Sequence, residues 1–219
     1  MIGSYPSSAG GEEYAVTFDR GRDRRLLVLP ALFDEANKLR HFTVEVMRRL
    51  DALGIDTFLP DLPGCNESLA PLAQQTLASW REAAKAAAVH FGATHVLTLR
   101  GGWLSEPAGI PCIRYSAVSG ASVLRALLRA RVISGKEAGL QESSEQLLQA
   151  GRTESLELAG YRLGGAMVRA LETAAPESEP FASIAQGQIG GPGLWLRAEP
   201  AHDAEQADAL AALAASHLS

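Results

Sequence analysis

Short apolar runs alternate with longer amphipathic segments along most of this chain, and this alternation is what most constrains its fold. The runs RRLLVLPAL, IDTFLPDL and HVLTL are continuously apolar, as strands buried on both faces are. The segments at 33–54 and 77–92 instead have helical spacing, shown in the first by Leu39, Phe42, Val46, Leu50 and Leu53. Strand and helix in regular alternation predict an α/β fold with a mostly parallel, doubly wound sheet.

The rest of the chain extends this pattern. Further strands are expected at 14–18, 111–118 and 193–200, and further helices at 119–133, 161–174 and 205–218. Asp34 or Asn37 is expected to cap the helix at 33–54, and Gly54 to end it.

The remaining segments define the expected domain organisation. Residues 1–13 are rich in Gly and Ser and predict a flexible tail, followed by a single domain over 14–219. Residues 136–160 are polar and weakly helical, which suggests a cap or lid over the sheet edge. Residues 176–193 are expected to form a loop.

Composition excludes several classes of protein. With 219 residues, 47% of them hydrophobic and 21% charged, the chain is long enough for one domain with its own core. A net charge of −5 and a pI of about 5.6 argue against a nucleic-acid binder. No apolar run approaches the ~20 residues that span a bilayer, so no membrane span is expected.

The first residues and the cysteines suggest a compartment. Residues 1–13 have neither the basic nor the apolar region of a signal peptide. Only two cysteines occur, Cys65 and Cys112, without metal-like spacing, which indicates a reducing environment and a cytoplasmic location. Whether the chain forms a homodimer is left open.

Ligands of open parallel sheets bind beyond the carboxyl ends of the strands. Those ends are expected at residues 30–35, 61–68, 100–105, 116–122 and 199–203. The order of these segments resembles the α/β-hydrolase fold, since LPDLPGCNES resembles its Asp-x-Pro-Gly-x-x-x-Ser turn. The segment HVLTLRGG stands where that fold has its Gly-x-Ser-x-Gly nucleophile elbow, with Thr98, Arg100 and Gly102 in place of Gly, Ser and Gly.

One branch of that superfamily is closer. LPALFDEANKLR, TLRGG, AVSGASVL and GYRLGG resemble, in the same order, segments of the exosortase A system-associated hydrolases, type 2, which occur near bacterial exopolysaccharide and protein-sorting genes. These segments span residues 26 to about 165. The resemblance implies a reduced α/β-hydrolase-like three-layer sandwich with a helical cap. The end of the chain matches less well, so the strands that normally carry the catalytic acid are expected to be missing.

Arg100 has two interpretations. An arginine stays protonated and is no nucleophile. At a strand-to-helix turn, it could grip a carboxylate or phosphate in a bidentate manner, helped by backbone N–H groups such as that of Gly101. Alternatively, Arg100 pairs with Asp61, Asp34 or Glu35 and joins the strand ends, because an unpaired buried arginine would be costly.

Neighbouring residues complete the candidate site. Glu35 could orient Arg100 or act as a base, or it could simply complement the helix N-terminus. Asn37 and Arg40 on the same segment, and Asp61 after the next strand, are candidate ligand-binding residues. His202 follows the last expected strand, where the resemblance places the catalytic histidine. It is equally readable as the polar start of the last helix.

Other nucleophiles and cofactor sites have little support. Ser105, Ser116, Ser119 and Ser122 lack the elbow setting. Cys65 would be reactive only if a nearby cation lowered its pKa, and Cys112 is expected in the core. The glycines at 187–193 lack the Lys-Ser/Thr of a phosphate loop, so neither cofactor nor metal is expected.

Two functions remain open. The first is a hydrolase-like protein without the elbow serine that binds or hydrolyses an acyl or anionic small molecule at Arg100. Catalysis would then require direct water attack, with Glu35 or His202 as base. The second is a non-catalytic binding or scaffold protein on a hydrolase fold, because fold does not imply function.

Overall fold

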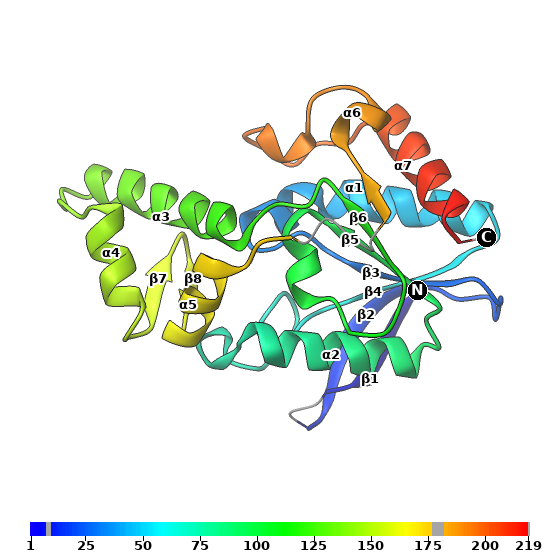
Figure 1. Ribbon diagram of the computed structural model, residues 1–219, viewed down its shortest axis with the longest axis horizontal. Helices are drawn as coiled ribbons and strands as arrows, with labels where there is room; N and C mark the ends of the chain where they lie inside the picture. Colours follow the sequence, from blue (N-terminus) through cyan, green and yellow to red (C-terminus); the bar gives the residue numbers. More distant parts are fainter. Residues whose placement is uncertain (8–9, 177–181, 219) are drawn as a thin grey trace.

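The computed structural model describes residues 1–7, 10–176 and 182–218, and its centre is a seven-stranded sheet in the order β1-β2-β4-β3-β5-β6-β9 (Figure 1). Neighbouring strands from β4 to β9 are parallel, whereas the pairs β1–β2 and β2–β4 are antiparallel. The predicted mostly parallel sheet is therefore confirmed. Its strands are β1 Ile2–Pro6, β2 Glu12–Phe18, β3 Arg25–Leu29, β4 Asp56–Pro60, β5 His95–Leu99, β6 Cys112–Tyr115 and β9 Ala182–Ile184.

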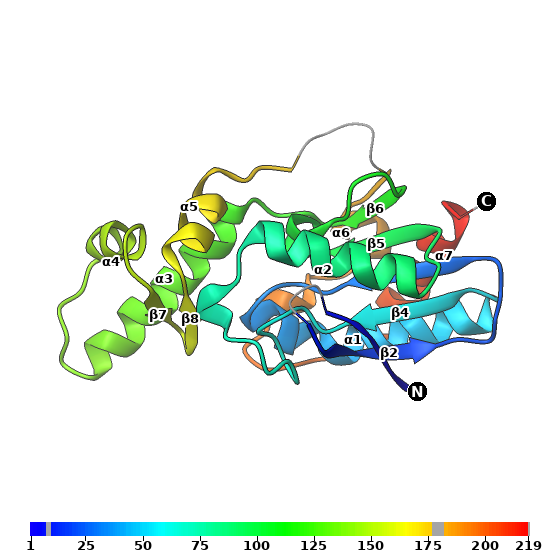
Figure 2. The same ribbon diagram turned by 90° about the horizontal axis from the view of Figure 1, so that it is seen from below.

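Helices cover both faces of the sheet, as Figures 1 and 2 show. Helices α1 (Asp34–Ala52) and α7 (Ala204–Ser216) pack on one face, and α2 (Leu77–His90) packs on the other. Successive residues of a strand point to opposite faces, so Leu26 and Val28 join the α1–α7 core while Leu27 and Leu29 join the α2 core. This arrangement makes three layers.

The start of α1 differs from the expectation. Neither Asp34 nor Asn37 caps the helix; the N-cap residue is Phe33, which has φ 57° and no side-chain hydrogen bond to the helix. Gly54 follows the helix in the left-handed conformation, as expected. Leu53 is 47% exposed and lies outside the core, because it is the C-cap residue after the last residue of the helix.

Residues 1–13 are expected to form a flexible tail, but the described residues among them, 1–7 and 10–13, include β1 and the start of β2. Strand β1 pairs with β2 at the sheet edge, and Tyr5 is completely buried. The Tyr5 hydroxyl donates to the backbone oxygen of Asp61 at 2.7 Å. A short strand with Gly, Ser and Pro is typical of a sheet edge, so its composition alone does not distinguish it from a tail.

The expected cap region has more regular structure than predicted. Residues 136–160 contain α4 Ser144–Gly151 and β7 Leu156–Leu158, and they belong to a larger region that projects beyond the sheet (left in Figure 1). The other elements of this projecting region are α3 Gly120–Glu137, β8 Tyr161–Leu163 and α5 Gly165–Thr173, and β7 and β8 form a two-stranded sheet. A helix was expected from residue 161. Ala159 and Gly160 instead both have positive φ and form the two-residue turn that joins β7 to β8.

The C-terminal region also departs from the prediction. The expected strand at 193–200 is wrong: it contains only the 3-10 turn η3, Leu194–Leu196. The strand that pairs with β6 is instead β9, which lies within the expected loop at 176–193. The same segment also contains α6 (Gln186–Ile189). Residues 177–181 of that loop lie outside the described residues. Two further 3-10 turns are η1 Leu72–Gln74 and η2 Arg100–Ser105.

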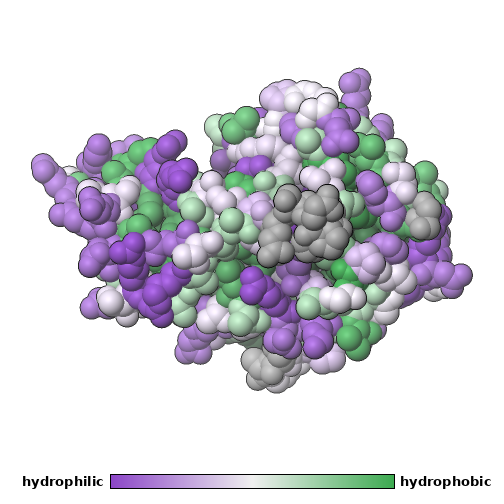
Figure 3. Space-filling model, viewed as in Figure 1, coloured by the Kyte–Doolittle hydropathy of each residue, from purple (hydrophilic) through white to green (hydrophobic). Residues whose placement is uncertain are grey.

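The surface shows the same division as the ribbon. In Figure 3 a notch separates the projecting α3–α5 region, which is largely hydrophilic, from the body that carries α6 and α7. Among the helices that the structure describes, none has the length and apolar character to cross a membrane.

Candidate functional site

A sharp turn follows β5, at the position of the expected elbow. Arg100 has φ 56°, a left-handed conformation that is uncommon for a non-glycine residue. Gly102 lies against the end of β3, where an added Cβ would come within 2.5 Å of the Pro30 oxygen and 2.6 Å of the Leu29 oxygen. Only glycine permits this approach, so the strained geometry of an elbow is present with an arginine at its tip.

The Arg100 side chain is fully engaged within the protein. Its Nε and Nη2 atoms each donate to a different carboxylate oxygen of Glu35 at 3.1 Å, and Nη1 donates to the Ser116 oxygen at 2.9 Å. The guanidinium also lies 3.8 Å from the centre of the Trp195 ring. Of the three acids left open by the sequence, the structure selects Glu35.

This arrangement leaves little for an external anion. Only 13% of the Arg100 side chain is exposed, and its charge is already paired with Glu35. Gly101 is buried, and a Cβ there would meet Val123 at 3.2 Å and Leu32 at 3.5 Å. A bidentate grip on a ligand would require Arg100 to give up Glu35, so the contacts favour the structural interpretation of Arg100.

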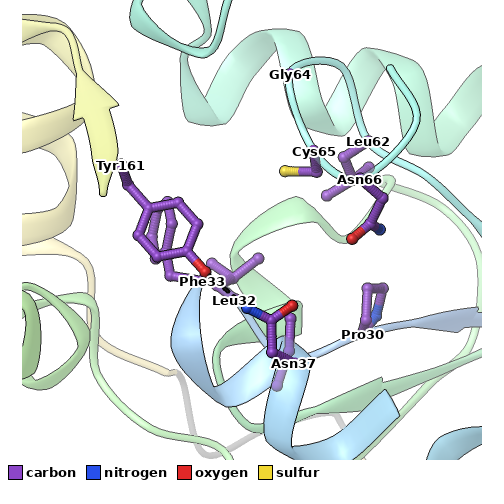
Figure 4. Close-up of a pocket in the computed structure, with 11 residues that line it drawn as sticks. Pro30, Leu32, Phe33, Asn37, Leu62, Gly64, Cys65, Asn66 and Tyr161 are labelled. Carbon is purple, nitrogen blue, oxygen red and sulfur yellow. Dashed lines mark hydrogen bonds between the residues drawn. The ribbon is translucent and has the colours of Figure 1, made fainter. Parts of the chain in front are cut away.

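A cavity lies beside the elbow, beyond the ends of β3 and β4 (Figure 4). It has a volume of about 230 Å³, and we call it the β3–β4 cavity. Three segments enclose it: the β3–α1 connection, the turn after β4, and strand β8 of the projecting region. The residues lining it are Pro30, Ala31, Leu32, Phe33, Ala36, Asn37, Leu62, Gly64, Cys65, Asn66 and Tyr161.

Three residues predicted for the site lie at or behind this cavity. Asn37 lines it directly and donates from Nδ2 to the Tyr161 hydroxyl at 3.0 Å. Asp61 lies behind it, 3% exposed, and accepts from Nδ2 of Asn66 at 2.7 Å. Arg40 approaches the same Asp61 oxygen at 3.6 Å and lines an adjoining hollow of about 190 Å³.

The ionisable groups of the cavity are neutral at physiological pH. Burial raises the pKa of the Cys65 thiol to about 12, and the charges of Asp61 and Glu13 add to the effect. Burial and the two nearby carboxylates therefore argue against a reactive Cys65, and among the described residues no cation contributes to lowering its pKa. Burial likewise raises the pKa of Tyr161 above its usual range. Cys112 is buried, as expected.

His202 is not brought to Arg100 by any contact of the described residues. Its ring packs on His41 of α1 with centroids 4.7 Å apart. His41, which His202 contacts, lies about 9 Å further along the axis of α1 than Glu35, which Arg100 contacts. The two side chains therefore contact different parts of the helix. Among the described residues, Nδ1 of His202 is buried without a hydrogen-bond partner.

Sequence reasoning missed three residues that shape the site. Trp195 lies in the segment 193–200, where the sequence predicts a strand that does not form, and Tyr161 lies in β8, where the sequence predicts a helix. Asn66 was passed over, although an Asn that follows Pro-Gly-x is a signal for the left-handed conformation that it adopts, φ 48°. Within the described residues, no group of three or more His, Cys, Asp and Glu side chains is arranged to hold a metal ion.

Solved structures with the same fold support the architecture. Est1E from Butyrivibrio proteoclasticus, solved with ferulic acid bound, has a TM-score of 0.52 and 18% identity over 78% of this chain and 71% of its own. A putative hydrolase from Agrobacterium vitis has a TM-score of 0.52 and 12% identity over 100% and 98%. The bottromycin epimerase BotH, in complex with bottromycin A2, has a TM-score of 0.52 and 16% identity over 99% and 98%.

These likenesses identify the fold alone. No protein-family model matches the chain, and no curated protein is significantly similar in sequence. The mostly parallel sheet, its two helical layers and its structural neighbours together show that the protein has the α/β-hydrolase fold.

Proposed function

We propose that this protein is a non-catalytic small-molecule-binding protein built on the α/β-hydrolase fold, with the β3–β4 cavity as its binding site. One observation supports this most: the tip of the elbow carries Arg100, whose guanidinium is occupied by Glu35, Ser116 and Trp195. The elbow thus offers neither a nucleophile nor a free cation. The open space lies next to it, in the β3–β4 cavity.

Hydrolysis by direct water attack is the alternative, and the contacts support it less. Glu35 holds Arg100 through both of its carboxylate oxygens, so its use as a base would have to compete with that ion pair. His202 has its ring contact with His41 instead. Neither candidate base lines the cavity.

The structural neighbours are compatible with either function. One is named a putative hydrolase and another an epimerase, so this fold does not determine a reaction. The resemblance to exosortase A system-associated hydrolases, type 2, rests on segments that include residues 29–40 and 98–102. These segments contribute one wall of the cavity and the Arg100 turn. The segments that carry the resemblance therefore coincide in part with the proposed binding site.

Labelling with a broad fluorophosphonate probe, followed by intact-mass spectrometry, tests the absence of an acyl-enzyme nucleophile. We expect no adduct on the wild type. We also expect none on Arg100→Ser, because the partners of Arg100 among the described residues include no histidine that could activate a serine there. A stoichiometric adduct on the wild type would overturn the proposal.

Hydrolysis of 4-nitrophenyl acetate tests water attack. We expect wild type, Glu35→Gln and His202→Ala to show the same background rate per mole of protein. A wild-type rate well above that background, lost in either variant, would establish catalysis and contradict the non-catalytic proposal.

A further inference from the structure

The β3–β4 cavity is apolar at its floor. Leu32, Phe33 and Leu62 are each less than 7% exposed and line it together with Pro30. The Phe33 ring meets the Tyr161 ring edge-on, with centroids 5.2 Å apart, so one wall is aromatic (Figure 4). A cavity of about 150 Å³ holds benzene, so about 230 Å³ accommodates a single ring with a small substituent.

Two amides flank the mouth of the cavity, and the carboxylate partner of Asn66 determines how that amide is oriented. The NH₂ group of Asn66 donates to Oδ1 of Asp61, and because a carboxylate only accepts, the Asn66 oxygen must face the other way. The NH₂ group of Asn37 donates to the Tyr161 hydroxyl.

The amide oxygens are therefore the ends left for a ligand. In Figure 4, the oxygen atoms of Asn37 and Asn66 point toward one another across the mouth. Neither oxygen accepts a hydrogen bond from the part of the chain that the structure describes. Two acceptors at the mouth select for a ligand with hydrogen-bond donors.

Charge is the second selective feature. None of the lining residues is an Asp, Glu, Lys, Arg or His, and the Cys65 thiol and Tyr161 phenol both stay protonated. An ion that entered the cavity would lose its hydration without gaining a counter-charge. This excludes the carboxylates and phosphates that the Arg100 hypothesis favoured.

We infer that the β3–β4 cavity binds a compact, uncharged molecule that places an apolar, ring-sized end on Leu32, Phe33 and Leu62 and a hydrogen-bond donor between Oδ1 of Asn37 and Oδ1 of Asn66. A phenol or alcohol O–H is shared between the two oxygens, whereas a primary amide donates one N–H to each. The ligand class is that of small neutral phenols, aryl alcohols and primary amides. This inference rests on the proposed function and adds the chemistry of its ligand.

Binding of two molecules of nearly the same shape tests the inference. 4-Methylphenol has a donor, whereas in 4-methylanisole that donor is methylated and the molecule is more apolar. By ligand-observed NMR titration of the full chain, we expect 4-methylphenol to bind at least about fivefold more tightly than 4-methylanisole. We expect no saturable binding of 4-methylbenzoate, which carries a charge.

Variants of the two amides connect that preference to the cavity. Asn66→Gly keeps the left-handed backbone without strain, and Asn37→Ala preserves helix α1. Each is expected to reduce the preference for 4-methylphenol to less than about twofold. Lys38→Ala, which changes a neighbouring residue of α1 that does not line the cavity, is the matched control and is expected to retain it.

Three results would overturn the inference: no saturable binding of 4-methylphenol at millimolar concentration, equal or tighter binding of 4-methylanisole or 4-methylbenzoate, or an unchanged preference in both folded amide variants. Circular dichroism and thermal unfolding establish that the variants are folded. The proposed function fails separately, through fluorophosphonate labelling or wild-type hydrolysis. If the ligand class is wrong but the protein shows neither fluorophosphonate labelling nor wild-type hydrolysis, the non-catalytic assignment is retained.

Discussion

Arg100 shows how one side chain changes what a turn can do. Its strained backbone is what an elbow requires, but its guanidinium joins α1, the segment after β6 and η3 through Glu35, Ser116 and Trp195. In a position where a hydroxyl would face a substrate, the side chain is 13% exposed and paired. The residue therefore acts as a structural link between three segments.

Replacing Glu35 by Gln should destabilise the protein because it leaves the Arg100 charge without its counter-ion. Both side chains are less than one third exposed, and we expect a loss of about 2 kcal/mol in the free energy of unfolding. Glu157→Gln is the control, since its pair with Arg162 is mostly exposed and should contribute less than about 0.5 kcal/mol. Urea denaturation measures both; equal small losses would contradict the structural role of Arg100.

At the scale of elements, the elbow depends on the close approach of η2 to β3. Gly102→Ala places a Cβ against two backbone oxygens that cannot move independently, and we expect a loss of about 3 kcal/mol. Gly187→Ala in α6 is the matched control: its Cβ meets open space, and alanine should gain about 0.5 kcal/mol. Similar melting temperatures for both variants would show that the turn can shift.

Helix α1 is also joined to the β2–β3 connection through Asp51, near its C-terminus. Hydrogen bonds from Arg20, and then from Arg22, hold the pKa of Asp51 at about 2, below its usual 3.8. A depressed pKa stabilises the fold above about pH 4, and the stabilisation is lost as the pH falls toward 2.

We therefore expect the urea midpoint of the wild type to fall between about pH 4 and pH 2. Asp51→Asn should have a lower midpoint at neutral pH and a weaker dependence in that window, because its amide does not titrate. An identical pH dependence in both proteins would mean that Asp51 contributes nothing to acid unfolding.

At the scale of the whole molecule, Trp195 of η3 links the C-terminal region to the Arg100 turn and to the sheet. Trp195 lies under Arg100 and meets Tyr115 edge-on, with centroids 6.1 Å apart. Trp195→Ala should increase hydrogen exchange over α6 and η3 more than tenfold while leaving α4 and α5 unchanged. Uniform exchange across both regions would show that Trp195 acts through global stability instead.

The sequence by itself determined those strands, helices and turns that depend on interactions within one segment. Continuous apolar runs predicted the central strands, helical spacing predicted α1, α2 and α7, and the Arg-Gly-Gly after HVLTL located the elbow. Each of these depends on burial or sterics within one segment, and so is readable from that segment.

Tertiary structure decided what depends on partners far apart in sequence. The N-terminal residues became β1 because β2 offered an edge, and residues 193–200 did not form a strand because β9 occupies the place beside β6. Glu35 was selected over Asp34 and Asp61 by geometry, and the cavity formed only where Tyr161 of the projecting region meets Asn37. Pairing energies depend on distance in space, which one sequence does not specify.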